Sequence, residues 1–373
     1  MLSSPAPTKP HFPILDGLRG VAAVTVVAFH LLEAHATTHF DLMINHGYLA
    51  VDFFFLLSGF VIGYAYDDRW NKMSVGRFLK LRFIRLQPMV VMGMIVGAIC
   101  FYFQDSPIWP TIHEVPVFKM LLVMLVGFTL FPLPLSMDIR GWQEMHPLNG
   151  PGWSLFYEYV ANILYGYVVR RFSNLALTML VVLSAAALLH LGLTSPQGDV
   201  IGGWALTPEQ IRVGLTRVMF PFFAGLLLFR YKKLATIKHG FFWCSLLILV
   251  VLAMPRLGGE NQVWINGLYE SFVIIFMFPL IVFMGASSQL HGKRATQLCK
   301  FLGEISYPIY ITHYPIIYIY TGWVHTQKPS LSAAYPTMLL AFIASIALAY
   351  GCLKMYDEPV RKWLTNKFLA RQA

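Results

Sequence analysis

Long apolar segments of about 20 residues, separated by short polar connections, dominate the chain. A helix of that length crosses the ~30 Å hydrocarbon core of a bilayer. The pattern therefore predicts an all-α, polytopic integral membrane bundle of about ten transmembrane helices, with both termini in the cytoplasm. The expected spans are 14–33, 47–66, 153–169, 175–193, 213–230, 240–256, 263–285, 302–322 and 334–355, together with one of the two segments 88–104 and 117–133.

The segments 88–104 and 117–133 cannot both cross without disturbing the charge pattern that follows. If both crossed, Arg170 and Arg171 would lie outside, whereas cytoplasmic connections carry the excess of Lys and Arg. We therefore expect one full crossing and one partial or re-entrant segment. Such a segment is tolerated where protein or water covers its backbone.

Positive charge marks the connections that we expect on the cytoplasmic side. The densest run follows the second span and holds Arg69, Lys72, Arg77, Lys80, Arg82 and Arg85. Further pairs occur at 170–171, 232–233 and 293–294. The chain shows no internal repeat and no soluble domain. We expect a cytoplasmic tail over 1–13, one membrane domain over 14–355 and a basic cytoplasmic tail over 356–373.

Composition agrees with this interpretation, since 57% of the 373 residues are hydrophobic and 12% are charged. The mean hydropathy is +0.60, far above that of soluble globular proteins. The net charge of +10 is split among the connections, which argues against nucleic-acid binding. The four cysteines form no CxxC pair, and the loop histidines His35, His39 and His46 are typical of a solvated surface. We expect no metal site and no permanently bound cofactor.

The first span, LDGLRGVAAVTVVAFH, carries Arg19 and His30 within an apolar run. Eleven residues make about three turns of helix, so both side chains leave one stripe roughly 16 Å apart. Charged or titratable groups inside a span indicate function, because hydrocarbon does not solvate them.

Counting helical turns from the outer surface predicts that His30, Asp52 and Glu158 lie at similar depth. A histidine with a carboxylate partner is a candidate general base, since the carboxylate fixes the tautomer and stabilises the imidazolium. The alternative is a structural histidine, with Glu158 paired to it or to an arginine elsewhere, and Asp52 facing the headgroups.

On the cytoplasmic side, Arg19 is expected at the depth where Arg82 and Arg85 enter the next span. Three converging guanidiniums suit phosphates, which they bind through paired hydrogen bonds. Anchoring to lipid phosphates is the alternative. In FLGEISYPIYITHYP, His313 falls near mid-membrane, where it either borders a route between the two sites or bonds within the bundle.

Several segments, taken in order, resemble one known family across nearly the whole chain. LDGLRGVAAVTVVAFH, GYLAVDFFFLLSGFVIGYAY, RFLKLRFIRLQP, WSLFYEYV, LGEISYPIYITHYP and YDEPVRKW are similar to the motifs of the acyltransferase-3 family of bacterial integral membrane O-acyltransferases. The first of these motifs contains Arg19 and His30, the second contains Asp52, and the fourth contains Trp153 and Glu158.

The resemblance implies transfer of an acyl group, usually acetyl, from cytoplasmic acyl-CoA to a hydroxyl of an extracytoplasmic or lipid-linked glycan. It implies a catalytic His30, assisted by Glu158 and Asp52. The residues expected to bind substrate are Arg19, Arg82, Arg85, Trp153, Ser154, Tyr307 and His313. The chain has LFYE where relatives often show LSVE, a departure that concerns the acceptor preference more than the chemistry.

Some relatives carry an additional SGNH-type domain outside the membrane. This chain ends about twenty residues after its last expected span. We therefore expect it to finish the reaction in one of three ways: alone, with an extracytoplasmic partner, or as a homo-oligomer. The competing interpretations are a transporter or flippase for an anionic glycan or acyl precursor, in which buried charges form a path, and a scaffold for glycan assembly. The absence of a visible repeat counts against the transporter.

Overall fold

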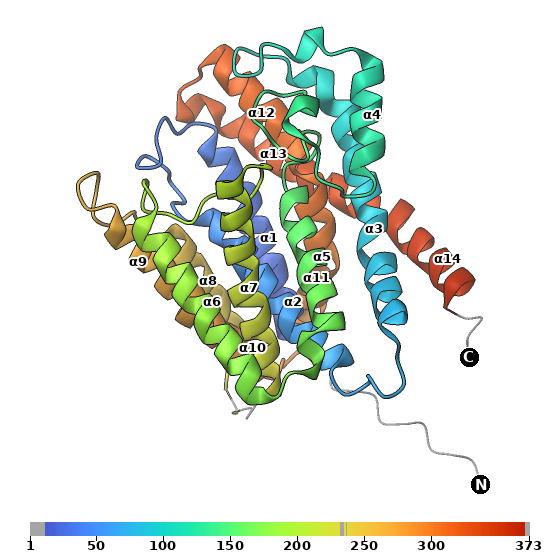
Figure 1. The fold of residues 1–373 in the computed structure, drawn as a ribbon. Coiled ribbons are helices and arrows are strands. Elements are labelled where there is room, and N and C mark those ends of the chain that lie inside the picture. The colour runs from blue at the N-terminus through green and yellow to red at the C-terminus, as the bar shows by residue number, and fades with distance from the viewer. Residues whose placement is uncertain (1–11, 232–234, 236, 370–373) are drawn as a thin grey trace.

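The computed structural model describes residues 12–231, 235 and 237–369, and these form α-helices joined by loops (Figure 1). The helices are α1 (Pro13–Glu33), α2 (Ala50–Tyr66), α3 (Val75–Cys100), α4 (Val117–Gly127), α5 (Gly152–Tyr167), α6 (Asn174–Thr194), α7 (Pro208–Arg230), α8 (Gly240–Ala253), α9 (Trp264–Phe272), α10 (Phe278–Ala286), α11 (Lys293–Thr312), α12 (Tyr314–Gln327), α13 (Leu331–Cys352) and α14 (Glu358–Phe368). π-Helical turns join α9 to α10 and α13 to α14. The predicted all-α class is confirmed.

Within the part of the chain that the structure describes, seven helical segments are long and apolar enough to cross a bilayer, which agrees with a helical membrane protein. They are Pro13–Glu33, Gly47–Tyr66, Val75–Gln104, Asn174–Thr194, Pro208–Arg230, Trp264–Ala286 and Leu331–Phe368. The expected spans 153–169 and 240–256 form the shorter helices α5 and α8. The total of ten crossings stays a prediction.

The basic stretch before residue 88 is the first half of a spanning helix, so the expected start of that span is wrong. The Ser74 side chain caps α3 by accepting a hydrogen bond of 3.2 Å from the backbone N–H of Arg77. Pro88 lies inside the helix. Over its 26 residues α3 is long enough to cross, whereas the 11 residues of α4 reach only about 16 Å. This agrees with one full and one partial segment (Figure 1).

Two further expected boundaries change. The predicted span 302–322 is interrupted at His313, where α11 ends and α12 begins with a proline in its first turn. The predicted tail 356–373 is helical through Phe368. Residues 370–373, the first eleven residues of the predicted N-terminal tail and the cation pair 232–233 lie outside the described residues.

Two helix pairs form the centre of the bundle, α1 with α11 and α2 with α7. Glycines let their backbones approach closely, as is common between membrane helices. A Cβ on Gly59 of α2 would lie 1.8 Å from the carbonyl oxygen of Phe222 in α7. A Cβ on Gly20 of α1 would lie 2.4 Å from the carbonyl oxygen of Leu302 in α11. These contacts hold α1 and α2, which carry His30 and Asp52, in fixed positions.

Candidate active site

A cavity of about 560 Å³ lies between α1, α2, α3, α5, α11, α14 and the helical turn that joins α13 to α14. We call it the arginine cavity. Its charged lining residues are Asp16, Arg19, Arg82, Arg85, Glu158, Lys300, Glu304, Asp357, Glu358 and Arg361. The predicted convergence of Arg19, Arg82 and Arg85 on one site is confirmed.

Most cations in the arginine cavity are already paired with carboxylates. Arg19 contacts Asp16 at 3.1 Å and donates to the hydroxyl of Ser306 at 2.8 Å. Arg361 contacts Asp357 at 3.0 Å. Arg85 is exposed to the cavity and has no carboxylate within 4 Å among the described residues. It is therefore the arginine most available to an anionic ligand.

Glu158 lies in the arginine cavity, so its expected position beside His30 is wrong. Its Oε1 accepts a bond of 2.7 Å from Arg82 and one of 2.6 Å from the hydroxyl of Ser58. Arg82 is buried, and its Nε has no partner among the described residues. The Glu158 carboxylate thus holds the Arg82 guanidinium at the cavity wall and leaves the Nε–H of Arg82 without a partner among the described residues.

The depth count for Glu158 failed because α5 does not begin at the surface. Every residue from 144 to 155 is buried, so the connection before α5 folds into the molecule. A count of turns from Trp153 therefore starts well inside the protein and carries Glu158 deeper than expected.

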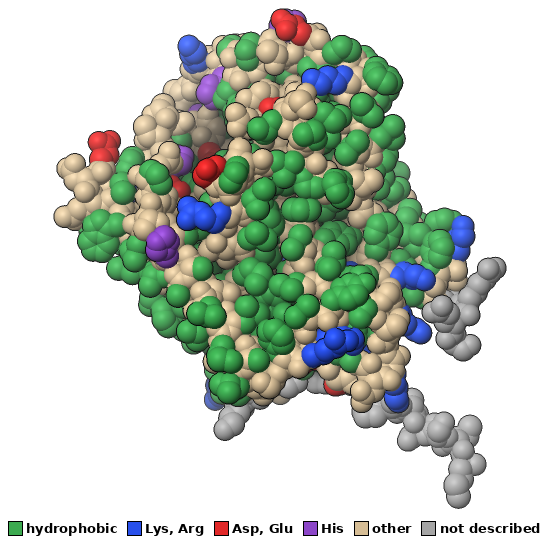
Figure 2. Space-filling view, viewed as in Figure 1, with side chains coloured by type: hydrophobic (Ala, Val, Ile, Leu, Met, Phe, Trp, Pro, Cys, Tyr) green, Lys and Arg blue, Asp and Glu red, His purple; other side chains and the backbone are tan. Residues whose placement is uncertain are grey.

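A second cavity, of about 640 Å³, contains His30, and we call it the histidine cavity. Its titratable lining residues include His30, Glu33, His39, Glu144, Arg217, His313 and His325. Aromatic rings supply much of the remaining wall, from Phe29, Tyr48, Trp109, Trp142, Trp153, Trp204, Tyr314 and Tyr318. Figure 2 shows a hollow in the upper left of the visible face, with histidine and acidic side chains around it.

Glu33 is the acidic partner of His30. Its Oε2 lies 2.7 Å from Nδ1 of His30, one turn away on α1. Because an ionised carboxylate only accepts hydrogen bonds, Nδ1 carries the proton, and in the neutral form of the ring Nε2 has a free electron pair. The ring packs edge-on against Tyr314, with centroids 4.8 Å apart. Sequence reasoning missed Glu33, although its spacing of three residues from His30 was visible.

Asp52 is completely buried and pairs with Arg217 of α7, which corrects its expected position beside His30. The guanidinium donates to both carboxylate oxygens, at 2.6 and 3.2 Å, and to the carbonyl oxygen of Tyr48 at 3.0 Å. Arg217 also lies over the ring of Trp153, 5.2 Å from its centroid, and lines the histidine cavity. Arg217 could have been found in the sequence as a charge within an expected span.

His313 is buried in the wall of the histidine cavity, with its ring 5.7 Å from that of His30. Its Nδ1 lies 2.9 Å from the carbonyl oxygen of Ile309 and 3.0 Å from that of Tyr310. Carbonyl oxygens accept, so Nδ1 is the protonated nitrogen. Nε2 has no partner among the described residues. His313 lines the histidine cavity but not the arginine cavity, and its contacts within its own helix agree with the expected alternative of a histidine that bonds within the bundle.

The remaining expected substrate-binding residues divide between the cavities. Trp153 lines the histidine cavity, whereas Ser154 and Tyr307 line the arginine cavity. The hydroxyl of Tyr307 donates to the carbonyl oxygen of Leu86 at 2.7 Å. Neighbouring residues of α5 thus face different cavities, so this helix helps to form the boundary between them.

Glu144, in the connection before α5, is a cavity residue that the sequence did not reveal. Burial raises the pKa of its carboxyl group to about 7, although the nearby Arg140 opposes this shift. The hydroxyl of Tyr318 lies 2.7 Å from one of its oxygens. Near neutral pH this acid can therefore carry a proton in the wall of the histidine cavity.

The loop histidines do not all face solvent as expected. His46 is fully buried with Nδ1 3.2 Å from Glu270, while His39 pairs with Asp199 at 3.1 Å. Within the described residues, no group of three His, Cys, Asp or Glu side chains is arranged to hold a metal ion.

Comparison with known proteins supports one family. A family model described as an acyltransferase domain, Acyl_transf_3, matches residues 12–354. The chain is 33% identical over 185 residues to protein 2 in the picA locus of Rhizobium radiobacter, which covers 48% of this chain and 93% of that protein.

Two other relatives have names that state an activity. The chain is 24% identical over 384 residues to the peptidoglycan O-acetyltransferase OatA of Listeria monocytogenes, and 23% identical over 370 residues to the O-acetyltransferase OatA of Staphylococcus aureus. These matches cover 95% and 94% of this chain but only 56% and 57% of those proteins. The chain thus spans little more than half their length. No solved structure matches it significantly.

Proposed function

The chain belongs to the acyltransferase-3 family, and from this premise we propose that it is a membrane O-acetyltransferase that uses acetyl-CoA and acetylates a glycan hydroxyl. One observation carries the proposal. A cavity with an available arginine and a cavity with a carboxylate-oriented histidine meet inside one bundle, at Val51 and Tyr310. This arrangement offers separate places for a charged donor and for an acceptor.

The proposal puts the arginine cavity at the cytoplasmic face of a bacterial inner membrane. The lining of the arginine cavity includes Pro13 at the start of α1 and Lys300 near the start of α11. The basic first half of α3 borders the same cavity. Because cytoplasmic ends of membrane proteins are rich in Lys and Arg, this charge pattern supports a cytoplasmic mouth and cytoplasmic termini.

Acetyl-CoA would bind with its phosphates at the mouth of the arginine cavity and its thioester deeper in the bundle. Among the described residues Arg85 has no carboxylate partner, so its guanidinium is available to such phosphates, and the Nε–H of Arg82 has no partner there either. Glu158 and Asp16 hold Arg82 and Arg19 in place. Glu158 thus acts through Arg82 and does not act as the partner of the catalytic base.

His30 would be the general base for the acceptor hydroxyl. Its Nε2 takes the hydroxyl proton while the oxygen attacks the thioester carbonyl carbon. The new C–O bond forms, the C–S bond breaks, and the proton passes from the imidazolium to the leaving CoA thiolate. Glu33 keeps Nδ1 protonated throughout and stabilises the positive charge on the ring.

The wall of the histidine cavity supports a sugar acceptor. Trp109, Trp142, Trp153 and Trp204 present flat apolar rings, while Glu33 and Glu144 present hydrogen-bonding oxygens. A sugar ring has apolar C–H faces and polar edges, so a pocket of aromatic rings with a few placed polar groups suits it.

Mass spectrometry of surface glycans from a deletion strain, complemented with wild-type or His30→Ala protein, tests this function. Wild type is expected to restore the mass of the acetyl groups, and His30→Ala protein to fail at equal abundance in the membrane. Deletion that removes the entire glycan, and not its acetyl groups, would favour the transporter. Full acetylation by His30→Ala protein would exclude His30 as the base.

A further inference from the structure

The two cavities have two lining residues in common, Val51 of α2 and Tyr310 of α11. Tyr310 is only 7% exposed and Val51 only 8% exposed, although each borders both cavities. The two side chains therefore form a partition where the arginine cavity and the histidine cavity adjoin.

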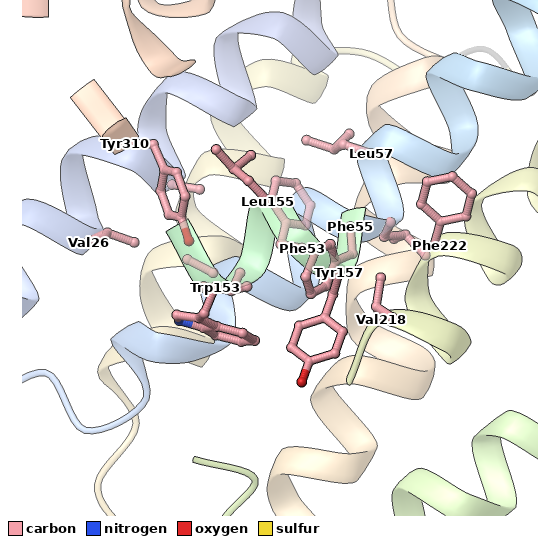
Figure 3. Packing of buried hydrophobic residues seen from close by; sticks show 14 of the residues in the cluster. Val26, Phe53, Phe55, Leu57, Trp153, Leu155, Tyr157, Val218, Phe222 and Tyr310 are labelled. Carbon is pink, nitrogen blue, oxygen red and sulfur yellow. The ribbon is translucent and has the colours of Figure 1, made fainter. Parts of the chain in front are cut away.

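The ring of Tyr310 is held in place on two sides. Its hydroxyl lies 2.7 Å from Oγ of Ser154, which in turn lies 3.0 Å from the carbonyl oxygen of Pro151. The carbonyl only accepts, so Ser154 donates to it, and Tyr310 must donate to Ser154. The ring also packs edge-on against Phe54, with centroids 5.4 Å apart. Figure 3 shows Tyr310 beside Trp153, with its hydroxyl directed toward α5.

The arginine-cavity side of the partition is apolar. Phe54, Leu57 and Leu155 line the cavity together with Val51 and Tyr310. Burial of an alkyl chain in such surroundings is favourable, because it removes apolar surface from water. This surface can therefore hold the acyl end of the donor.

We propose that Tyr310 and Val51 set the maximum size of the acyl group that this enzyme transfers. This inference rests on the proposed acyl transfer. The thioester carbonyl has to reach the acceptor through the partition, and the space there is limited by a tyrosine ring that Ser154 and Phe54 keep from turning aside. A short acyl group passes, and a longer one meets the ring.

The test compares transfer of acetyl, propionyl and butyryl groups from their CoA thioesters by purified full-length protein, with kcat/KM as the readout. Tyr310→Ala is expected to lower the preference for acetyl over butyryl by roughly tenfold or more, the usual discrimination of an apolar pocket against added methylenes. Val51→Ala is expected to shift the preference in the same direction by a smaller factor.

Val61→Ala is the matched control, because Val61 also belongs to α2 but lines only the arginine cavity. Its acyl preference is expected to equal that of wild type. Ser154→Ala removes the hydroxyl that holds Tyr310 and leaves the tyrosine ring itself unchanged. This variant is expected to lower the preference for acetyl over butyryl.

The possible failures can be told apart. If wild type transfers no acyl group, the proposed function fails and the inference with it. If wild type transfers acetyl but the Tyr310→Ala, Ser154→Ala and Val51→Ala proteins keep its acyl preference, the partition does not select acyl size. Should Tyr310→Ala protein not fold, Ser154→Ala and Val51→Ala decide the question.

Discussion

The two ring nitrogens of His30 have different surroundings, and this asymmetry is central to the proposed chemistry. Nδ1 is bound to Glu33, and Nε2 is left to face the histidine cavity. We predict that Glu33→Gln lowers kcat for acetyl transfer by roughly tenfold or more, because the neutral amide no longer fixes the tautomer or stabilises the imidazolium. The KM for acetyl-CoA should not change, since the proposed site for that substrate is the arginine cavity.

A double-mutant cycle separates this role from a general effect on the fold. In a His30→Ala background, Glu33→Gln should cause no additional loss, because its effect acts through the ring that has been removed. An equal loss in both backgrounds, or a parallel rise in the KM for acetyl-CoA, would contradict the orienting role of Glu33.

Arg85 differs from its neighbours in having no carboxylate partner among the described residues. We predict that Arg85→Ala raises the KM for acetyl-CoA by about tenfold or more, as expected for the loss of a hydrogen bond to a charged group. Arg77→Ala is the control, because Arg77 is an exposed arginine of α3 that does not line the cavity. Equal KM values for the two variants and wild type would show that Arg85 serves membrane anchoring.

At the scale of elements, close packing of α2 on α7 aligns residues of both cavities. Gly59→Ala would force a Cβ to within 1.8 Å of a backbone carbonyl oxygen, which a rotamer change cannot relieve. We predict a loss of stability of about 1–3 kcal/mol, seen as a lower melting temperature in detergent. Gly76→Ala in α3 is the control, since nothing lies within 4 Å of the added Cβ. An unchanged melting temperature for Gly59→Ala would contradict the close helix contact.

The loop from residue 34 to residue 46 forms part of the wall of the histidine cavity, and His39 fixes it to Asp199. The hydrogen bond to Asp199 is the main cause that raises the pKa of His39; Asp199 and Glu33 charges add to this, while burial and Arg256 oppose it. Because the folded pKa is raised, this stabilisation is fully present below the unfolded pKa of about 6.5 and is lost as pH rises through the folded value.

We therefore predict that hydrogen exchange in residues 34–46 becomes faster, beyond the intrinsic effect of pH, as pH rises above the pKa of His39. His39→Gln should exchange at the fast rate at all pH values, after the same correction. A wild-type loop whose corrected exchange rate does not depend on pH would contradict an ionic attachment through His39.

At the scale of the whole molecule, the sequence predicted the features that depend on one helix at a time. The apolar runs located the helices, and a count of turns correctly brought Arg19 together with Arg82 and Arg85. The count failed for Glu158, because it assumed that α5 begins at the membrane surface. It also could not show that Asp52 faces Arg217, since the contact follows from glycine packing between α2 and α7.

The partition between the cavities was equally out of reach of sequence reasoning. Tyr310 was visible as a motif residue one turn before His313, but its place depends on Ser154 in α5 and Phe54 in α2. Three helices that are distant in the chain must pack before such a boundary exists. Local periodicity reports the face of each helix and not which helix lies opposite.

In the proposed function, His30 activates the acceptor for transfer from acetyl-CoA. Its most direct test is the rate of labelled acetyl transfer from acetyl-CoA to glycan by purified protein in vesicles, for wild type and for His30→Ala. We predict a loss of roughly 10²–10⁴-fold in kcat, as for removal of a general base, with binding of acetyl-CoA unchanged. A His30→Ala protein that transfers acetyl at the wild-type rate would exclude His30 as the general base.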